Sequence, residues 1–145
     1  KKICSAAALS ILVEGKISNV GSNWSNNIDY TASRSYAPKD YEDLAKWLRL
    51  NSGPVKVHGT KHSFNDVADT VGHHVSMENF QDIKVDVENM RVTMGAGATY
   101  INLIEALKDH KVALRNLPSL PHINVVGSVI TGTHGSGLEK QGMAA

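Results

Sequence analysis

The spacing of apolar residues predicts two amphipathic helices in this chain. In the first, apolar residues recur at the three- and four-residue intervals of one helix face, at Tyr41, Leu44, Ala45 and Leu48. Asp40 is placed to cap this helix, and Gly53-Pro54 is expected to end it. In the second helix Thr99 is the expected cap, and one face carries Tyr100, Leu103, Ile104 and Leu107.

Alternating apolar and polar residues between these helices predict strands. Residues 55–57 form a short strand that runs into a loop, and a second strand is expected over 74–77. The alternation over 83–87 resumes over 90–94, which predicts a hairpin. This order of elements favours an α+β fold over the alternating order of a doubly wound nucleotide-binding fold. The run Gly95-Ala-Gly-Ala-Thr-Tyr100 also fails as a dinucleotide fingerprint, because tyrosine stands where the third glycine is required.

The N-terminal part of the chain has two different patterns. Two lysines precede an apolar run over 3–13, as in a secretory signal peptide, and a buried helix or strand of the domain is the alternative. This run is too short to span a bilayer, so no spanning segment is expected, and cytoplasmic and secreted locations both stay open. Residues 1–22 are therefore treated as an N-terminal extension. Residues 14–35 are polar and rich in turn formers, which predicts irregular chain with Trp24 and Tyr30 as its apolar anchors.

Composition indicates a globular domain with a small partner. The chain has 145 residues, enough to bury a core, and its 15 Lys and Arg residues are balanced by 14 Asp and Glu residues. Because neither sign forms a long run, no nucleic-acid partner is expected. The single cysteine, Cys4, excludes an intrachain disulfide. The sequence stops soon after a glycine-rich segment without a closing helix or strand signal, so we expect a domain that is incomplete at its C-terminus.

The glycine-rich segment, residues 119–137, has the composition of a phosphate-binding loop. Glycines lack a Cβ and let main-chain N–H groups approach a ligand, here at Gly127, Gly132, Gly135 and Gly137. Hydroxyl donors are available at Ser119, Ser128, Thr131 and Thr133. Apart from two histidines the segment has no basic side chain, so a pyrophosphate would be held by neutral dipoles and by a helix N-terminus at Val125–Val126. A plain connecting loop is the alternative.

Histidine spacing does not predict a metal site. His58 and His62 have the i, i+4 spacing of a zinc-binding helix, but Gly59 replaces the catalytic glutamate and favours a loop. His73 and His74 are adjacent, so on a strand they face opposite sides of the sheet. We therefore assign no metal ligands.

The loop around His62 suggests a different chemistry. A strand that ends in glycine, polar residues, His-Ser and Phe presents an imidazole at the edge of a pocket. Neutral imidazole is a nucleophile, and it can attack the methyl carbon at the dimethylbenzene edge of a flavin once that methyl has lost a proton. The alternative is a loop histidine that is hydrogen-bonded to a nearby carbonyl.

Two segments together, Val57-His-Gly-Thr-Lys-His-Ser-Phe-Asn65 and residues 117–137, resemble the PCMH-type FAD-binding domain of vanillyl-alcohol-oxidase-type flavoproteins. Within that superfamily they are similar to the alditol and xylitol oxidases, and next to the gulonolactone and arabinonolactone oxidases. The resemblance begins at Asn23-Trp24 and implies that residues 23–145 form an FAD-binding domain, truncated at its C-terminus.

The resemblance also implies which residues contact the cofactor. Flavin contacts map to His58, Gly59, Thr60, Lys61, His62 and Ser63 in the first segment. In the second segment, which cradles the pyrophosphate, they map to Ser119, Asn124, Gly127, Thr131, Gly132, Thr133 and His134. In the group, the histidine of a Gly-x-Gly-His-Ser loop is bonded covalently to FAD, and this histidine maps to His62. Lys61 replaces the glycine before it, which affects the backbone geometry at the attachment point, and Asn124 replaces a serine.

The function implied by the resemblance is that of an FAD-dependent oxidase. Such an enzyme oxidises the CH–OH group of a polyol or sugar lactone and passes the electrons to molecular oxygen, which gives hydrogen peroxide. The substrate-binding and proton-accepting residues of the family belong to a second domain, so we assign no catalytic residue and expect the 145-residue chain alone to be inactive. A non-catalytic flavin-binding fragment and a structural or metal-binding α+β domain are the alternatives.

Overall fold

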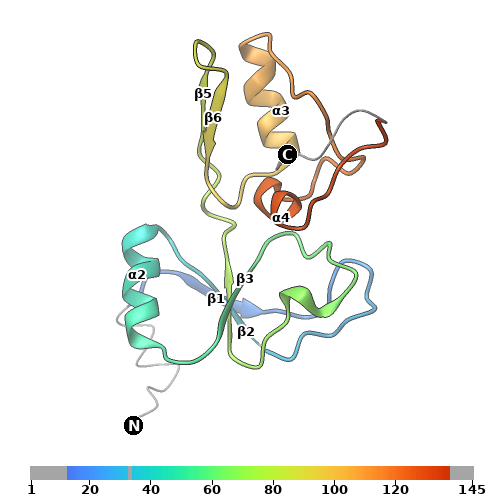
Figure 1. Ribbon diagram of the computed structural model, residues 1–145. Helices are drawn as coiled ribbons and strands as arrows, with labels where there is room; N and C mark the ends of the chain where they lie inside the picture. Colours follow the sequence, from blue (N-terminus) through green and yellow to red (C-terminus); the bar gives the residue numbers. More distant parts are fainter. Residues whose placement is uncertain (1–12, 33, 138–145) are drawn as a thin grey trace. The chain divides into compact units, whose positions relative to one another are not determined.

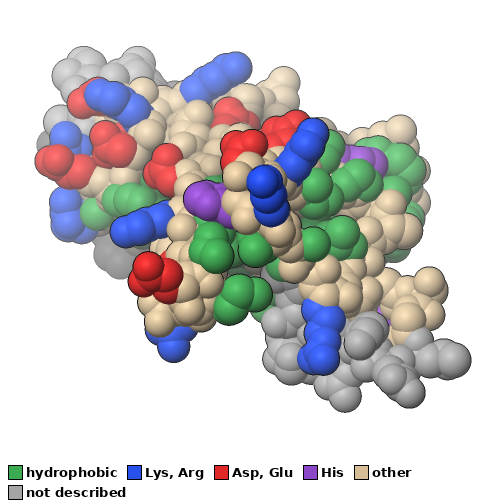
Figure 2. All heavy atoms as spheres, turned by 90° about the horizontal axis from the view of Figure 1, so that it is seen from above, with side chains coloured by type: hydrophobic (Ala, Val, Ile, Leu, Met, Phe, Trp, Pro, Cys, Tyr) green, Lys and Arg blue, Asp and Glu red, His purple; other side chains and the backbone are tan. Residues whose placement is uncertain are grey.

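The computed structural model describes residues 13–32 and 34–137, and its chain divides into two compact units, residues 1–79 and 80–145. Most of the apolar run over 3–13 lies outside the described residues. Within the described ranges, no helix combines the length and apolar character needed to cross a lipid bilayer. Figure 2 shows a face on which Lys and Arg side chains lie among Asp, Glu and apolar side chains, in keeping with the balanced composition.

The first unit is built on a four-stranded sheet with the strand order β1-β2-β4-β3. The strands are β1 (Lys16–Asn19), β2 (Arg34–Ala37), β3 (Val55–His58) and β4 (His73–Ser76). β2, β4 and β3 are parallel neighbours, and β1 is antiparallel to β2. The predicted strands over 55–57 and 74–77 are thus confirmed, each with its bounds shifted by one residue. β1 and the start of β2 lie in the segment expected to be irregular, which was wrong because all four β1 side chains are exposed and show no alternation.

Helix α2 (Tyr41–Leu50) links β2 to β3 (Figure 1). It packs on the sheet through Trp47, whose ring stacks on Tyr36 with centroids 5.0 Å apart. Asp40 caps the helix as predicted, because its side chain accepts a hydrogen bond from the Asp43 amide. The predicted apolar face is buried only in part, since Leu44 packs against the core around Trp47. Tyr41 is 64% exposed and Leu48 43% exposed, because the helix is rotated so that Trp47 and Asp43 face inward.

The buried carboxylate of Asp43 joins α2 to three places in the chain: to β2, to the residues that follow β2, and to the residues that precede β1. It accepts hydrogen bonds from the Tyr36 hydroxyl (2.6 Å) and from the amides of Lys39 (2.9 Å) and Glu14 (2.9 Å). Burial alone would raise its pKa, but these hydrogen bonds to the charged form lower it. A carboxylate with this many donors is stable inside the fold, which explains why a charged residue lies on the buried face of α2.

The second unit contains the β5–β6 hairpin and two helices. β5 (Ile83–Asp86) and β6 (Arg91–Met94) pair as antiparallel strands, which confirms the hairpin, and α3 (Tyr100–Asp109) packs against it (Figure 1). Thr99 caps α3 in a capping box with Asn102. On the predicted apolar face of α3, Tyr100, Leu103 and Leu107 are buried. The fourth residue, Ile104, is 38% exposed. A short helix, α4 (Val125–Ile130), follows the long connection after α3.

A mixed sheet with a helical crossover beside a separate hairpin unit confirms the α+β class. The two candidate segments lie in different units: the loop around His62 belongs to the first, and residues 119–134 belong to the second.

Candidate functional site

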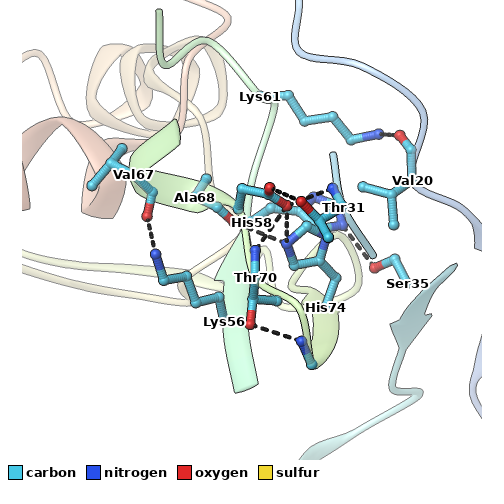
Figure 3. Close-up of polar contacts among 12 residues, drawn as sticks. Val20, Thr31, Ser35, Lys56, His58, Lys61, Val67, Ala68, Thr70 and His74 are labelled. Carbon is cyan, nitrogen blue, oxygen red and sulfur yellow. Dashed lines mark hydrogen bonds and ion pairs between the residues drawn. The ribbon is translucent and has the colours of Figure 1, made fainter. Parts of the chain in front are cut away.

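The loop after β3 begins at His58, which is buried at the end of the strand. Its Nδ1 lies 3.1 Å from the Gly59 carbonyl, and its Nε2 lies 2.7 Å from the Ser35 hydroxyl (Figure 3). Because a carbonyl only accepts, Nδ1 carries the proton and Nε2 accepts from Ser35. Burial lowers the pKa of His58, so the ring is neutral. Both ring nitrogens of His58 are hydrogen-bonded within the chain. A ligand could therefore contact His58 only through its backbone atoms.

The far end of the same loop is tied down by the 3₁₀ turn η1 (Asp66–Ala68). The Lys56 ammonium donates to the Val67 carbonyl at 2.8 Å, and Nε2 of His74 donates to the Ala68 carbonyl at 2.9 Å (Figure 3). These contacts come from β3 and β4, so the sheet fixes the point at which the loop ends.

Asp69 continues this anchoring just after η1. Its carboxylate accepts hydrogen bonds from the Thr31 amide (2.8 Å) and hydroxyl (2.5 Å) (Figure 3). These hydrogen bonds, first of all that of the Thr31 side chain, lower the pKa of Asp69. His74 is buried, and burial lowers its pKa, so its ring is neutral. Its Nε2 lies 4.0 Å from the Asp69 carboxylate.

Lys61, the departure from the family pattern, has a backbone φ of 62°. This left-handed conformation is the one that glycine adopts without strain, so the backbone here is one that glycine would also fit. Its ammonium donates to the Val20 carbonyl (Figure 3), and burial lowers its pKa. The side-chain contact compensates for part of the strain at this position.

His62 is half-buried, and its ring stacks on Trp24 with centroids 4.8 Å apart and an interplanar angle of 26°. Of the two apolar anchors predicted for residues 14–35, Tyr30 is buried at 8% exposure, whereas Trp24 is 57% exposed. The same segment supplies Asn23 and Asn27, whose side-chain amides donate to the carbonyls of Ser63 and Phe64. Sequence reasoning missed these contacts; the run of three asparagines and a tryptophan was the available signal.

In the second unit, α4 begins at Val125 as predicted. The Val125 amide donates to the Ala98 carbonyl (3.1 Å), and Nδ2 of Asn124 donates to the Gly97 carbonyl (2.7 Å). Asn124 therefore ties the start of α4 to the turn before α3, in addition to any role toward a ligand.

The hydroxyl groups of this segment differ in availability. Ser128 is buried, donates to the Val125 carbonyl (2.8 Å) and lies 2.6 Å from the Tyr100 hydroxyl, so the expectation that it offers a donor to phosphate was wrong. The exposed Thr131 lies 3.0 Å from both the Gly127 carbonyl and the Thr133 hydroxyl. Ser119 is exposed. Because the Thr131 proton goes to the Gly127 carbonyl, the Thr133 hydroxyl donates to Thr131, and Ser119 is the hydroxyl best placed to donate outward.

The glycines of the segment fall into two groups. A Cβ added at Gly127 or Gly132 would meet no chain atom within 4 Å, and Gly132 has a φ of +66°. A Cβ at Gly135 would lie 2.4 Å from the Leu117 carbonyl oxygen, so this glycine serves the chain's own packing instead of ligand approach. Open space over Gly127 leaves room for a ligand that contacts a main-chain N–H group, as a diphosphate does. The Gly132 amide already donates to the Val129 carbonyl at 3.2 Å, so open space there leaves room for a ligand but no free N–H group.

His134 is exposed, and its Nδ1 donates to the Gly135 carbonyl at 2.7 Å. In the neutral ring Nε2 is then an acceptor. Over the described ranges no three His, Cys, Asp or Glu side chains are grouped as metal ligands would be. The second unit thus offers neutral backbone and hydroxyl groups. The first unit offers an imidazole that is stacked on an indole.

Comparisons with known proteins identify the class of this domain. Residues 33–145 match a family described as an FAD binding domain, and the chain belongs to this family, whose relatives here are PCMH-type flavoproteins. The alditol oxidase of a Streptomyces species is 36% identical over 132 residues, covering 89% of this chain and 32% of that protein. L-gulonolactone oxidase of Bos taurus is 32% identical over 127 residues, covering 85% and 29%.

Solved structures show the same fold. Cholesterol oxidase from Brevibacterium sterolicum superposes with a TM-score of 0.73 at 22% identity, over 85% of this chain and 25% of that one. The BBE-like 1 protein of Physcomitrella patens gives a TM-score of 0.70 at 19% identity, over 88% and 30%. The chain thus spans about a third of the length of the alditol oxidase that it matches.

Proposed function

We propose that this chain is the cofactor-binding part of an FAD-dependent oxidase that acts on the CH–OH group of a polyol or sugar lactone. The observation that carries this proposal is the 36% identity to an alditol oxidase over 89% of the chain. Bound FAD would take a hydride from the carbinol carbon and pass two electrons to molecular oxygen, which gives hydrogen peroxide. The domain itself comprises residues 23–145 in this proposal.

Residues of the first unit would hold the flavin. Gly59, Thr60 and Ser63 line the loop that the family resemblance assigns to flavin contact, and His62 is its nucleophile. In covalent attachment, a ring nitrogen of His62 would give up its proton and form a C–N bond to the flavin methyl carbon, which would give up one hydrogen. The two protons and two electrons released reduce dioxygen to hydrogen peroxide, so the balance requires no further reactant.

Residues of the second unit would hold the pyrophosphate. Open space over Gly127 and Gly132, together with the exposed hydroxyl of Ser119, supports this role. Thr133 is a proposed contact through its oxygen. Asn124, Thr131 and His134 are further proposed contacts. Because none of these residues is a lysine or arginine, the phosphate charge would be met mainly by neutral dipoles.

FAD binding is tested by titrating the purified chain and following the visible absorption and fluorescence of the flavin. The proposal predicts saturable binding, with a spectrum that differs from that of free FAD. If the flavin spectrum is unchanged at FAD concentrations well above that of the protein, the proposal is wrong. A flavin-binding module without turnover is the second candidate.

Turnover is tested with a hybrid in which this chain replaces the matched segment of the Streptomyces alditol oxidase. We expect peroxide formation from xylitol or sorbitol by the hybrid and none by the 145-residue chain alone. A folded hybrid that binds FAD but produces no peroxide from polyols or gulonolactone would favour the non-catalytic module.

A further inference from the structure

The residues on either side of His62 are held by one short segment, Asn23–Asn27. The Trp24 amide donates to the Lys61 carbonyl at 2.9 Å. Nδ2 of Asn23 donates to the Ser63 carbonyl at 2.8 Å, and Nδ2 of Asn27 donates to the Phe64 carbonyl at 3.1 Å. Backbone carbonyls before and after His62 are therefore all bound by the same turn, which we call the asparagine clamp.

The asparagine clamp is itself closed by its own hydrogen bonds. Asn23 is 2% exposed, and its Oδ1 accepts from the amides of Asn27 (3.1 Å) and Ile28 (3.2 Å). The Asn26 amide donates to the Asn23 carbonyl, and Asn26 has a φ of 55°, which asparagine tolerates better than most residues. A buried side chain that serves as both acceptor and donor cannot be moved without leaving polar groups unpaired. The turn is thus rigid without any ligand.

The clamp also restricts the imidazole. The indole of Trp24 lies nearly parallel to the His62 ring, 4.8 Å away between centroids. Because the indole of Trp24 is 57% exposed, it contributes less to core packing than a buried indole would. Its ring contact is the stack on His62. Stacking limits rotation of the imidazole about its side-chain bonds. Nδ1 of His62 is buried, so Nε2 is the ring nitrogen to which the attachment is assigned.

We propose that the asparagine clamp is a positioning device for flavin attachment: it fixes the His62 loop before FAD binds, and Trp24 orients the imidazole. This inference rests on the proposed function of His62 as the attachment residue. Nucleophilic attack requires near-contact geometry between the ring nitrogen and the methyl carbon, and small misplacements of the nucleophile slow such steps strongly. Trp24 acts through His62, so it is a positioning residue and not a catalytic one.

The test follows covalent attachment over time in the chain incubated with FAD, as fluorescence that stays with the polypeptide on a denaturing gel. Trp24→Ala should slow attachment about tenfold or more, and Trp24→Phe should recover most of the rate, because a phenyl ring can still stack. Tyr41→Ala, which removes an exposed aromatic residue from α2, is the matched control and should leave the rate unchanged.

Non-covalent affinity separates positioning from binding. In a His62→Ala background, which cannot form the bond, adding Trp24→Ala should change the dissociation constant for FAD less than about threefold, against the tenfold effect on rate. A loss of affinity as large as the loss of rate would mean that Trp24 binds the cofactor, and the positioning role would be overturned.

Amide hydrogen exchange tests the clamp without any flavin. In the FAD-free chain the Trp24 amide should be protected, and Asn23→Ala should remove that protection. An unprotected Trp24 amide in the unmodified chain would overturn the clamp, whatever the flavin does. Conversely, covalent attachment at an unchanged rate in Trp24→Ala would refute the positioning role while leaving the proposed function intact, whereas no attachment in the unmodified chain would refute the role of His62.

Discussion

The hydroxyl groups of Tyr100 and Ser128 lie 2.6 Å apart in the interior of the second unit, and they join α3 to α4. Tyr100 is the residue that prevents the preceding glycines from forming a dinucleotide fingerprint. It is fully buried, and its hydroxyl donates to Ser128, because the Ser128 proton is directed to the Val125 carbonyl. The tyrosine thus fixes the helix that carries Gly127 instead of contacting a nucleotide itself.

This relationship predicts unequal effects of removing either hydroxyl. Ser128→Ala leaves the buried Tyr100 hydroxyl without its acceptor and should lower the free energy of unfolding by about 1–3 kcal/mol. Tyr100→Phe leaves Ser128 bonded to Val125 and should cost about 1 kcal/mol. Urea unfolding of the two variants measures the difference, and a larger loss in Tyr100→Phe would contradict this hydrogen-bond direction.

Gly127 offers a test of ligand approach that leaves the fold unchanged. Because an added Cβ meets no chain atom and alanine is a better helix former, Gly127→Ala should keep or slightly raise stability while weakening FAD binding. Ser119→Ala is the control, since losing one exposed neutral hydroxyl should cost about 1 kcal/mol of binding free energy at most. Equal FAD affinity in Gly127→Ala and the unmodified chain would show that no cofactor atom approaches this position.

Gly132 is less informative, because two effects combine there. Its positive φ means that alanine is strained whatever lies nearby, so Gly132→Ala should destabilise the chain by about 1 kcal/mol even without FAD. A stability measurement must therefore accompany any binding result at this position.

The left-handed conformation of Lys61 predicts that glycine is the more stable residue there once the side-chain contact is removed. Lys61→Ala and Lys61→Gly both lose the hydrogen bond to the Val20 carbonyl, but only alanine retains the backbone strain. Lys61→Gly should therefore be more stable than Lys61→Ala by about 1 kcal/mol. Thermal unfolding of the pair decides this, and equal stabilities would mean that the φ of 62° carries no strain in solution.

Burial lowers the pKa values of His58 and His74, which predicts an acid-sensitive first unit. Below the ordinary histidine pKa of 6.5 the unfolded chain binds protons that the folded chain does not, so stability is full above that pH and falls as the pH decreases through it. Unfolding free energies measured between pH 7.5 and 5.5 should decline over this range.

His74→Gln provides the control for this titration, because the glutamine amide can still donate to the Ala68 carbonyl but does not titrate. The decline should be smaller in this variant. A pH profile that is flat, or one unchanged by His74→Gln, would contradict the assignment.

Local signals in the sequence were sufficient for the hairpin, for α3 and for the caps at Asp40 and Thr99. They failed where packing between distant segments decides the outcome. The stack of Trp47 on Tyr36 and the hydrogen bonds to Asp43 rotate α2 away from its apparent apolar face.

The candidate site shows the same division. The loop around His62 and the start of α4 could be read from composition and family resemblance, whereas the asparagine clamp could not. The contact of Asn23 with Ser63 joins residues 40 positions apart, and an asparagine-rich run alone indicates only a turn. The buried role of Ser128 was missed for a related reason, since a serine's partners depend on which helix face packs inward.

The most direct test of the central claim is the mass of peptides from the chain after incubation with FAD, denaturation and protease digestion. The account predicts that the peptide containing His62 gains the mass of FAD less two hydrogen atoms, and that His62→Ala abolishes the gain while keeping non-covalent FAD binding. Attachment at another residue, or complete release of flavin from the unmodified chain after it has bound FAD, would contradict it.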